Sequence, residues 1–175
     1  MPERIRQAAV LTQRGVDLFF QGKYDEARAA LERAVTLTPN SPRPYSAMAL
    51  CLAQLGNPRA GLEYAEKAVT LDPASAVALT ARGFCFHRLG DGERAVADFE
   101  RALQLDPSDY RVWYNFACHW AERGDEEKCR YYLATAFDLA PAHFAGAAGA
   151  DPDLGRYSQK DWFRELLARL KTRGE

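Results

Sequence analysis

Residues 76–109 read AVALTARGFCFHRLGDGERAVADFERALQLDPSD and contain two runs of apolar residues at helical spacing. Gly90 separates the two runs, and Pro107 follows the second. Glycine can take the left-handed conformation that closes a helix, whereas proline cannot continue one. The stretch therefore predicts a hairpin of two helices.

The same pattern recurs along the chain at a fixed period, which is a signature of repeat architectures. Four columns of like residues keep one register: Pro39, Pro73, Pro107 and Pro141; Gly22, Gly56, Gly90 and Gly124; Ala34, Ala68, Ala102 and Ala136; and Gly15, Ala49, Gly83 and Ala117. They predict four hairpins after a lead-in at residues 1–7, with the boundaries 8–41, 42–75, 76–109 and 110–143. Because one hairpin cannot bury its apolar face alone, stability must come from stacking on neighbours.

The second hairpin illustrates how its helices are delimited. We expect Ser41 to cap a first helix that starts at Pro42 and runs to about Gln54. Gly56 then makes the turn in a left-handed conformation. A second helix is expected over about residues 59–71, before an Asp-Pro pair that stops it.

Residue size at two further positions predicts how the helices pack. Small residues such as Gly15 and Gly83 let the paired helix approach closely. Large ones at another position fill the space between hairpins, and these are Leu31, Phe99 and Leu133. The second hairpin has Ala65 at that position and Gly61 in place of the preceding alanine, so we expect it to pack more loosely.

Residues 144–175 depart from the repeat. Small residues over 142–150 are compatible with a short helix, and a last helix is expected from about Lys160. Its apolar side would consist of Trp162, Phe163, Leu166, Leu167 and Leu170. Such a stripe must be covered. We favour a cap that shields the open end of the stack, with a docking or dimer face as the alternative.

Composition excludes several classes of protein. The 23 basic residues are matched by 24 acidic ones, whereas nucleic-acid binders normally carry a basic excess, so we expect no nucleic-acid partner. No stretch is long and apolar enough for membrane insertion or for a secretory signal, so we expect a cytoplasmic protein.

The four cysteines and three histidines do not form a metal-binding pattern. Cys51 and Cys85 occupy the same packed repeat position. Cys118 and His119 are neighbours, and side chains of adjacent helical residues point about 100° apart. No phosphate-binding loop or catalytic set is present either. We therefore expect no metal, no cofactor and no catalytic activity.

Charged residues of the second helices stand at spacings typical of surface ion pairs. Glu63 precedes Lys67 by four residues, and Arg94 precedes Asp98 by four. We interpret these as solvated charges.

The repeat columns resemble the tetratricopeptide repeat, in which a Trp-x2-Leu-Gly-x2-Tyr pattern is followed by Gly, Ala, Phe, Ala and Pro at set places. The resemblance covers residues 8–143 and is clearest in the third hairpin, which has Gly83, Phe86, Gly90, Ala95, Phe99, Ala102 and Pro107. It implies an all-α fold, a right-handed superhelical solenoid of four helical hairpins with a C-terminal capping helix.

The resemblance also implies a concave groove lined by the first helices. The groove positions are the second, fifth, sixth, ninth, twelfth and thirteenth of each repeat. Carried onto this sequence, the side chains expected to contact a partner are Phe19, Phe20, Arg43, Leu50, Phe84, His87, Arg88, Arg111, Tyr114, Asn115 and Cys118. Other residues at these positions include Thr12, Gln13, Val16, Ser46, Ala47, Gln54, Thr80 and Glu122.

Aromatic area combined with arginine suits an extended or helical peptide segment of another protein. Arg111 and Asn115, four residues apart on one helical face, are the pair most expected to contact it, with a solvated face as the alternative. Phe19, Phe20 and Phe84 have core packing as their alternative role.

Family members that clamp the carboxyl terminus of heat-shock chaperones use a set of Lys, Asn and Arg residues. The corresponding positions here are Thr12, Val16, Ala47, Val77 and Ala81, or one repeat later Ser46, Leu50, Ala81, Arg111 and Asn115. At most one cation is in place, which argues against such a clamp. We expect an adaptor; the alternatives are self-assembly into a dimer or larger scaffold, and a dedicated chaperone for a secreted client.

Overall fold

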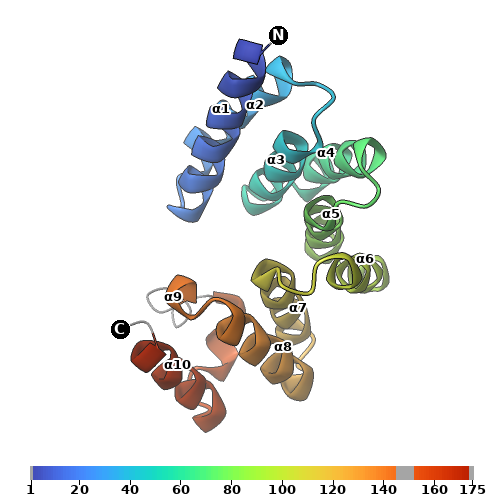
Figure 1. The fold of residues 1–175 in the computed structure, drawn as a ribbon. Coiled ribbons are helices and arrows are strands. Elements are labelled where there is room, and N and C mark those ends of the chain that lie inside the picture. Colours follow the sequence, from blue (N-terminus) through green and yellow to red (C-terminus); the bar gives the residue numbers. More distant parts are fainter. Residues whose placement is uncertain (1, 145–151, 174–175) are drawn as a thin grey trace. The chain divides into compact units, whose positions relative to one another are not determined.

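The computed structural model describes residues 2–144 and 152–173, and the regular structure within these ranges is helical throughout. In chain order the elements are α1 Pro2–Phe20, α2 Tyr24–Leu37, α3 Pro42–Gln54, α4 Pro58–Leu71, α5 Ala76–Arg88, α6 Gly92–Leu105, α7 Tyr110–Glu122, α8 Glu126–Leu139, α9 Pro141–Phe144, the 3₁₀ helix η2 Pro152–Tyr157 and α10 Asp161–Arg173. Helices α1 to α8 form successive pairs (Figure 1). The chain divides into two compact units, residues 1–105 and 106–175.

Each hairpin turn is made by a glycine with a positive φ, as predicted. The four are Gly22, Gly56, Gly90 and Gly124, with φ between +74° and +81°. At the end of α3, Gly56 N–H donates to Ala53 O at 3.2 Å and Asn57 N–H donates to Leu52 O at 2.9 Å. This pair of bonds satisfies carbonyls that the helix end leaves without intrahelical donors.

The helix bounds of the second hairpin are confirmed, but the predicted cap by Ser41 is wrong. Ser41 occupies the position before α3, yet its side chain makes no capping hydrogen bond. A capping oxygen accepts from the second or third N–H of the helix, and the third residue of α3 is Pro44, which has none. In α5 the third residue is Ala78, and Ser75 Oγ does accept from its N–H at 3.2 Å.

The small repeat positions are sites of close helix contact. A Cβ placed on Gly83 would lie 2.8 Å from the Phe99 ring. On Gly61 it would lie 2.7 Å from Ala49 O. The expectation of loose packing in the second hairpin is therefore wrong at Gly61. Because this residue has no side chain, the backbones of α3 and α4 lie close together there.

In the first unit, the first helices lie next to one another. Helix α1 contacts α3, and α3 contacts α5. Each second helix packs on the first helix of its own hairpin: α2 on α1, α4 on α3 and α6 on α5. Residues 2–7, expected to be a lead-in, continue α1 as regular helix. Arg82 fastens α5 to α6 with two hydrogen bonds to the buried Asp98, at 2.7 and 2.8 Å.

In the second unit, α10 covers the last hairpin. The prediction of a final helix is confirmed, and its apolar side packs against α8 and α9. The core shared by these elements contains Leu133, Phe137, Phe144, Leu154, Trp162, Phe163, Leu166 and Leu170. The stripe is thus covered by the chain itself, as the cap interpretation requires. Of the short helix considered over 142–150, α9 covers the start, and residues 145–150 lie outside the described part.

Candidate functional site

We define the first-helix face as the exposed sides of α1, α3 and α5 at the predicted groove positions of the first unit. Arg43 Nη2 donates to Gln13 Oε1 at 3.1 Å, which links α3 to α1 across this face. Leu50 and Phe84 pack against one cluster of buried residues and so link α3 to α5. The groove positions of three successive repeats therefore form one continuous surface.

An apolar column crosses the first-helix face. It consists of Val16, Leu50 and Phe84, which occupy the ninth position of successive repeats and are all partly exposed. Leu50 and Phe84 rest on a floor of small side chains, namely Ala49, Ala53, Ala65, Ala81 and Cys85. The column offers apolar contact area on a closely packed support.

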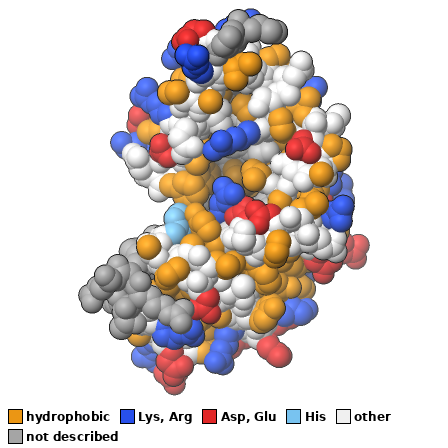
Figure 2. Space-filling view, viewed as in Figure 1, with side chains coloured by type: hydrophobic (Ala, Val, Ile, Leu, Met, Phe, Trp, Pro, Cys, Tyr) orange, Lys and Arg blue, Asp and Glu red, His pale blue; other side chains and the backbone are white. Residues whose placement is uncertain are grey.

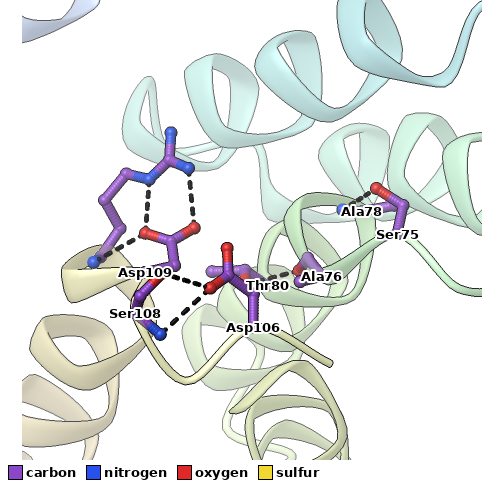
Figure 3. Close-up of polar contacts among 8 residues, drawn as sticks. Ser75, Ala76, Ala78, Thr80, Asp106, Ser108 and Asp109 are labelled. Atoms are coloured by element: carbon purple, nitrogen blue, oxygen red, sulfur yellow. Dashed lines mark hydrogen bonds and ion pairs between the residues drawn. The ribbon is translucent and has the colours of Figure 1, made fainter. Parts of the chain in front are cut away.

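The fifth position of each of the first three repeats is buried. Thr12, Ser46 and Thr80 are 1 to 5% exposed. Their hydroxyl groups donate to backbone carbonyls one turn earlier, Thr12 to Ala8 O at 2.7 Å and Thr80 to Ala76 O at 2.7 Å (Figure 3). These three side chains are therefore structural, and their donors are already used.

The aromatic candidates of the first unit differ in exposure. Phe20 is 52% exposed, and its ring meets the Phe19 ring edge to face with centroids 5.6 Å apart. Phe19 is partly buried and packs on Tyr24, with centroids 5.4 Å apart. His87 is only 6% exposed, so a partner could reach its ring only after neighbouring side chains moved. Of these, Phe20 is the ring that a partner can contact directly.

The charged side chains of α3 and α5 are all basic. Helices α3 and α5 contain Arg43, Arg82 and Arg88 and no carboxylate. Arg82 is paired with Asp98, while Arg43 and Arg88 are exposed. Figure 2 shows one side of the molecule, on which both signs of charge lie among hydrophobic side chains. The basic character is therefore a property of these helices and not of the surface generally.

The remaining candidates belong to α7 in the second unit. Arg111 donates to both carboxylate oxygens of Asp109 at 2.7 Å, and Figure 3 shows the hydrogen bonds around this aspartate. Tyr114 stacks on Phe144 with centroids 4.9 Å apart. Asn115 is partly exposed, and Cys118 is 4% exposed. Most of these side chains thus have structural contacts within their own unit.

The sequence analysis missed two exposed apolar residues of α1, one before the first repeat and one near its start. Ile5 is 59% and Val10 67% exposed. The signal was present, because buried Ala8 and Leu11 continue the helical spacing of the repeat toward the amino terminus. The lead-in was not assigned to a helix because the family pattern begins only at residue 8.

The four cysteines are buried and form no disulfide. Burial raises the pKa of Cys51 to about 11 and those of Cys85 and Cys129 to about 12. A thiol with such a pKa is a poor nucleophile and a poor metal ligand at neutral pH. Among residues 2–144 and 152–173, no three His, Cys, Asp or Glu side chains are grouped as a metal site. No helix in that part of the chain is long and apolar enough to span a bilayer.

Comparison with protein families gives three matches of one kind. Models described as TPR repeat and as tetratricopeptide repeat match residues 15–56, 42–75 and 76–109. The matched segments are continuous from residue 15 to residue 109. A search of curated proteins finds no match.

Solved structures give fold relatives over the whole chain. TTC0263, a thermophilic TPR protein from Thermus thermophilus, is 20% identical with a TM-score of 0.67, covering 94% of this chain and 97% of its own. Pseudomonas aeruginosa pilF is 19% identical with a TM-score of 0.65, covering 99% and 78%. At these identities the likeness is one of fold. It confirms the predicted all-α fold of paired repeat helices.

A third solved structure contains a bound peptide. The first TPR of Spaghetti (RPAP3), bound to the HSP90 peptide SRMEEVD, is 26% identical to this chain with a TM-score of 0.56. The alignment covers 74% of this chain and 95% of that one.

Proposed function

Because this chain belongs to the tetratricopeptide repeat family, we propose that it is an adaptor that binds a segment of a partner protein on its first-helix face. The family is in general a non-catalytic protein-interaction fold. We further propose the repeat boundaries 8–41, 42–75, 76–109 and 110–143 and a cytoplasmic location. The four cysteines form no disulfide, which supports a reducing compartment.

The observation that carries the proposal is the continuity of the face across three repeats. A surface that exposes Val16, Leu50 and Phe84 in one column, with arginines beside it, offers both apolar area and charge-assisted donors. Interfaces derive most of their free energy of binding from a few central residues, among which arginine and large aromatic side chains are enriched. A folded partner could present a helix to this face, and an unfolded one an extended strand.

The peptide bound by the first TPR of Spaghetti supports a peptide ligand for this chain as well. The set of cations and asparagines of a chaperone-tail clamp is incomplete here: Thr12, Ala47 and Ala81 stand at its positions in one register, and one repeat later only Arg111 supplies a cation. We therefore propose a peptide ligand that is not a chaperone tail.

Partner capture with charge-reversed baits tests the proposal. The face variant is Arg43→Glu with Arg88→Glu, and a matched control variant is Arg33→Glu with Arg59→Glu on the second helices α2 and α4. All four arginines are exposed, so both variants change the net charge equally and leave the cores intact. Partners captured from native lysate by wild type are quantified by mass spectrometry on all three baits.

The expected result is a protein that wild type and the control hold equally and that the face variant loses by about tenfold, equivalent to about 1.4 kcal/mol. Direct titration of that protein then gives the affinity. Equal recovery of every partner on all three baits would show that the first-helix face is not the binding site.

Self-assembly is a second candidate, and one observation favours it. Ile5 and Val10 on α1, the pair that we call the α1 edge, are more than half exposed, at 59% and 67%. Contiguous exposed apolar area is what marks an interaction surface. We propose that a second copy could cover this edge. Sedimentation over a hundredfold concentration range, with Ile5→Lys and Val10→Lys as the edge variant, distinguishes a dimer that dissociates in the variant from a chain that is monomeric throughout.

A further inference from the structure

The charge distribution on the first-helix face narrows the choice of ligand. We infer that the face takes an internal protein segment in which large apolar side chains are flanked on both sides by carboxylates. This inference rests on the proposed function, and it specifies the chemistry of the segment and how its charges are spaced.

The part of the face formed by α3 and α5 carries no acidic side chain, and the acidic residue beside it is Asp17 on α1. Helices α3 and α5 contain no carboxylate, whereas the second helices carry both signs, with Asp25, Glu26 and Glu32 on α2, Glu63 and Glu66 on α4, and Glu93, Asp98 and Glu100 on α6. On α1, Asp17 accepts a hydrogen bond from Gln13 Nε2 at 2.9 Å, and Glu3 lies in the first turn. A basic surface of this kind attracts acidic segments and repels basic ones.

The two exposed arginines lie at opposite ends of the face. Arg43 is the second residue of α3, and Arg88 is the last residue of α5. The chain reverses between α3 and α4 and again between α4 and α5, so α3 and α5 run in the same direction. A helix of this length extends about 20 Å, so the backbone positions of the two arginines are separated by roughly that distance along the helices.

At this separation, a single carboxylate does not bind both arginines at once. The separation instead requires two acidic groups, one for each arginine. In an extended ligand, about 20 Å corresponds to roughly six residues, and in a helical ligand to roughly thirteen. Between the two ends lie Leu50 and Phe84, so the stretch between the carboxylates must be apolar.

A chain terminus is a poor fit to this arrangement. Capture of a terminal carboxylate takes several donors that converge on one point. The donors nearest the column are already used, since Thr12, Ser46 and Thr80 bond to their own helices and Gln13 bonds to Asp17 and Arg43. An internal segment needs only side-chain carboxylates, and for these the two arginines suffice.

Selection from random peptide libraries tests the inference without a known partner. The full chain is used as bait against two libraries of 16-residue peptides, one flanked by carrier sequence on both sides and one with a free carboxyl terminus. Parallel selections use Arg43→Gln with Arg88→Gln as the face variant, and Arg33→Gln with Arg59→Gln as the control. A third bait, Leu50→Lys, removes apolar character from the column. All baits are first required to match wild type in helicity and unfolding midpoint.

We expect the flanked library to yield peptides with Asp or Glu on both sides of Leu, Phe, Ile or Met. The pairs of acidic residues should be spaced by about six or about thirteen residues. Their affinity should fall about tenfold or more on the face variant and remain unchanged on the control. Peptides that are neutral or basic and still depend on Leu50 would overturn the inference while leaving the proposed function intact.

Two other outcomes also decide the question. Binding only from the library with free carboxyl termini would overturn the internal segment. Peptides that bind the face variant, the Leu50→Lys bait and wild type equally would contradict the proposed function itself, because the first-helix face would then not be the binding surface.

Discussion

Arg111 lies with its Nε and Nη2 atoms each 2.7 Å from a carboxylate oxygen of Asp109. Asp109 is the residue before α7, is 7% exposed, and also accepts a hydrogen bond from the backbone N–H of Arg111 at 3.0 Å. The hydrogen bond to Asp109 raises the pKa of Arg111. Arg111, which was expected to contact a ligand, thus neutralises Asp109, the buried residue that caps α7.

Replacing Arg111 by Gln is therefore expected to destabilise the second unit. Asp109 would keep its backbone bonds but lose both guanidinium donors, which costs about 1 to 2 kcal/mol for a partner that is itself half exposed. Urea unfolding followed by circular dichroism measures the loss. The double variant Asp109→Asn with Arg111→Gln should lose less than the sum of the single changes, and strict additivity would show that the pair does not interact.

Gly61 is expected to tolerate no side chain. Its Cβ would meet Ala49 O at 2.7 Å and Cys85 Sγ at 3.1 Å, and a backbone oxygen cannot rotate away. We expect Gly61→Ala to destabilise the first unit by about 1 to 3 kcal/mol, despite a helix-propensity gain of about 1 kcal/mol. The control is Gly155→Ala, where no atom lies within 4 Å of the added methyl group and the unfolding midpoint should not fall. If the Gly61→Ala variant were as stable as wild type, α3 and α4 would be able to move apart without loss of stability.

The repeat period predicted most of the fold because each repeated residue has one local role. A glycine with a positive φ ends each first helix, and the second helices end at Leu37, Leu71, Leu105 and Leu139, before the prolines. These properties depend on a few neighbouring residues and are readable without knowledge of the partner repeat.

Side-chain partners were harder to predict because they depend on contacts between elements. Arg94 and Asp98 stand at ion-pair spacing, yet Asp98 binds Arg82 on the preceding helix and Arg94 binds Asp91. Likewise, the groove positions carried over from the family pattern include the buried His87 and Cys118. Spacing along one helix cannot reveal which neighbouring helix covers a side chain. The sequence therefore predicts the region of the candidate site better than the individual residues that are exposed there.

The docking of α10 is expected to depend on pH through Glu126. Hydrogen bonds from Lys160, at 2.8 Å, and from Trp162 Nε1, also at 2.8 Å, lower the pKa of this carboxyl below its usual 4.5. A lowered pKa in the folded state contributes stability above the usual value, and that stability is lost as the pH falls through the lowered pKa. Glu126→Gln should therefore reduce the unfolding midpoint at pH 6, and its difference from wild type should shrink as the pH is lowered below 4.5. Thermal unfolding at fixed ionic strength checks this, with Glu127→Gln as the control, and a difference that stays constant over this pH range would assign the effect to packing.

The buried thiols are expected to resist alkylation until the chain unfolds. Burial is the largest cause of the raised pKa values of Cys51, Cys85 and Cys129, about 11 for the first and about 12 for the others. At pH 8 the thiolate fraction of a thiol with a pKa near 12 is about a thousandfold lower than that of one near 9, and the reagent must also reach the sulfur. Iodoacetamide at pH 8 should label these three residues at least about a hundredfold more slowly in the native chain than in urea, as peptide mass spectrometry would show. Rapid labelling of Cys85 in the native chain would mean that α3 and α5 separate often, because that sulfur lies 3.8 Å from Ala49 O in their contact.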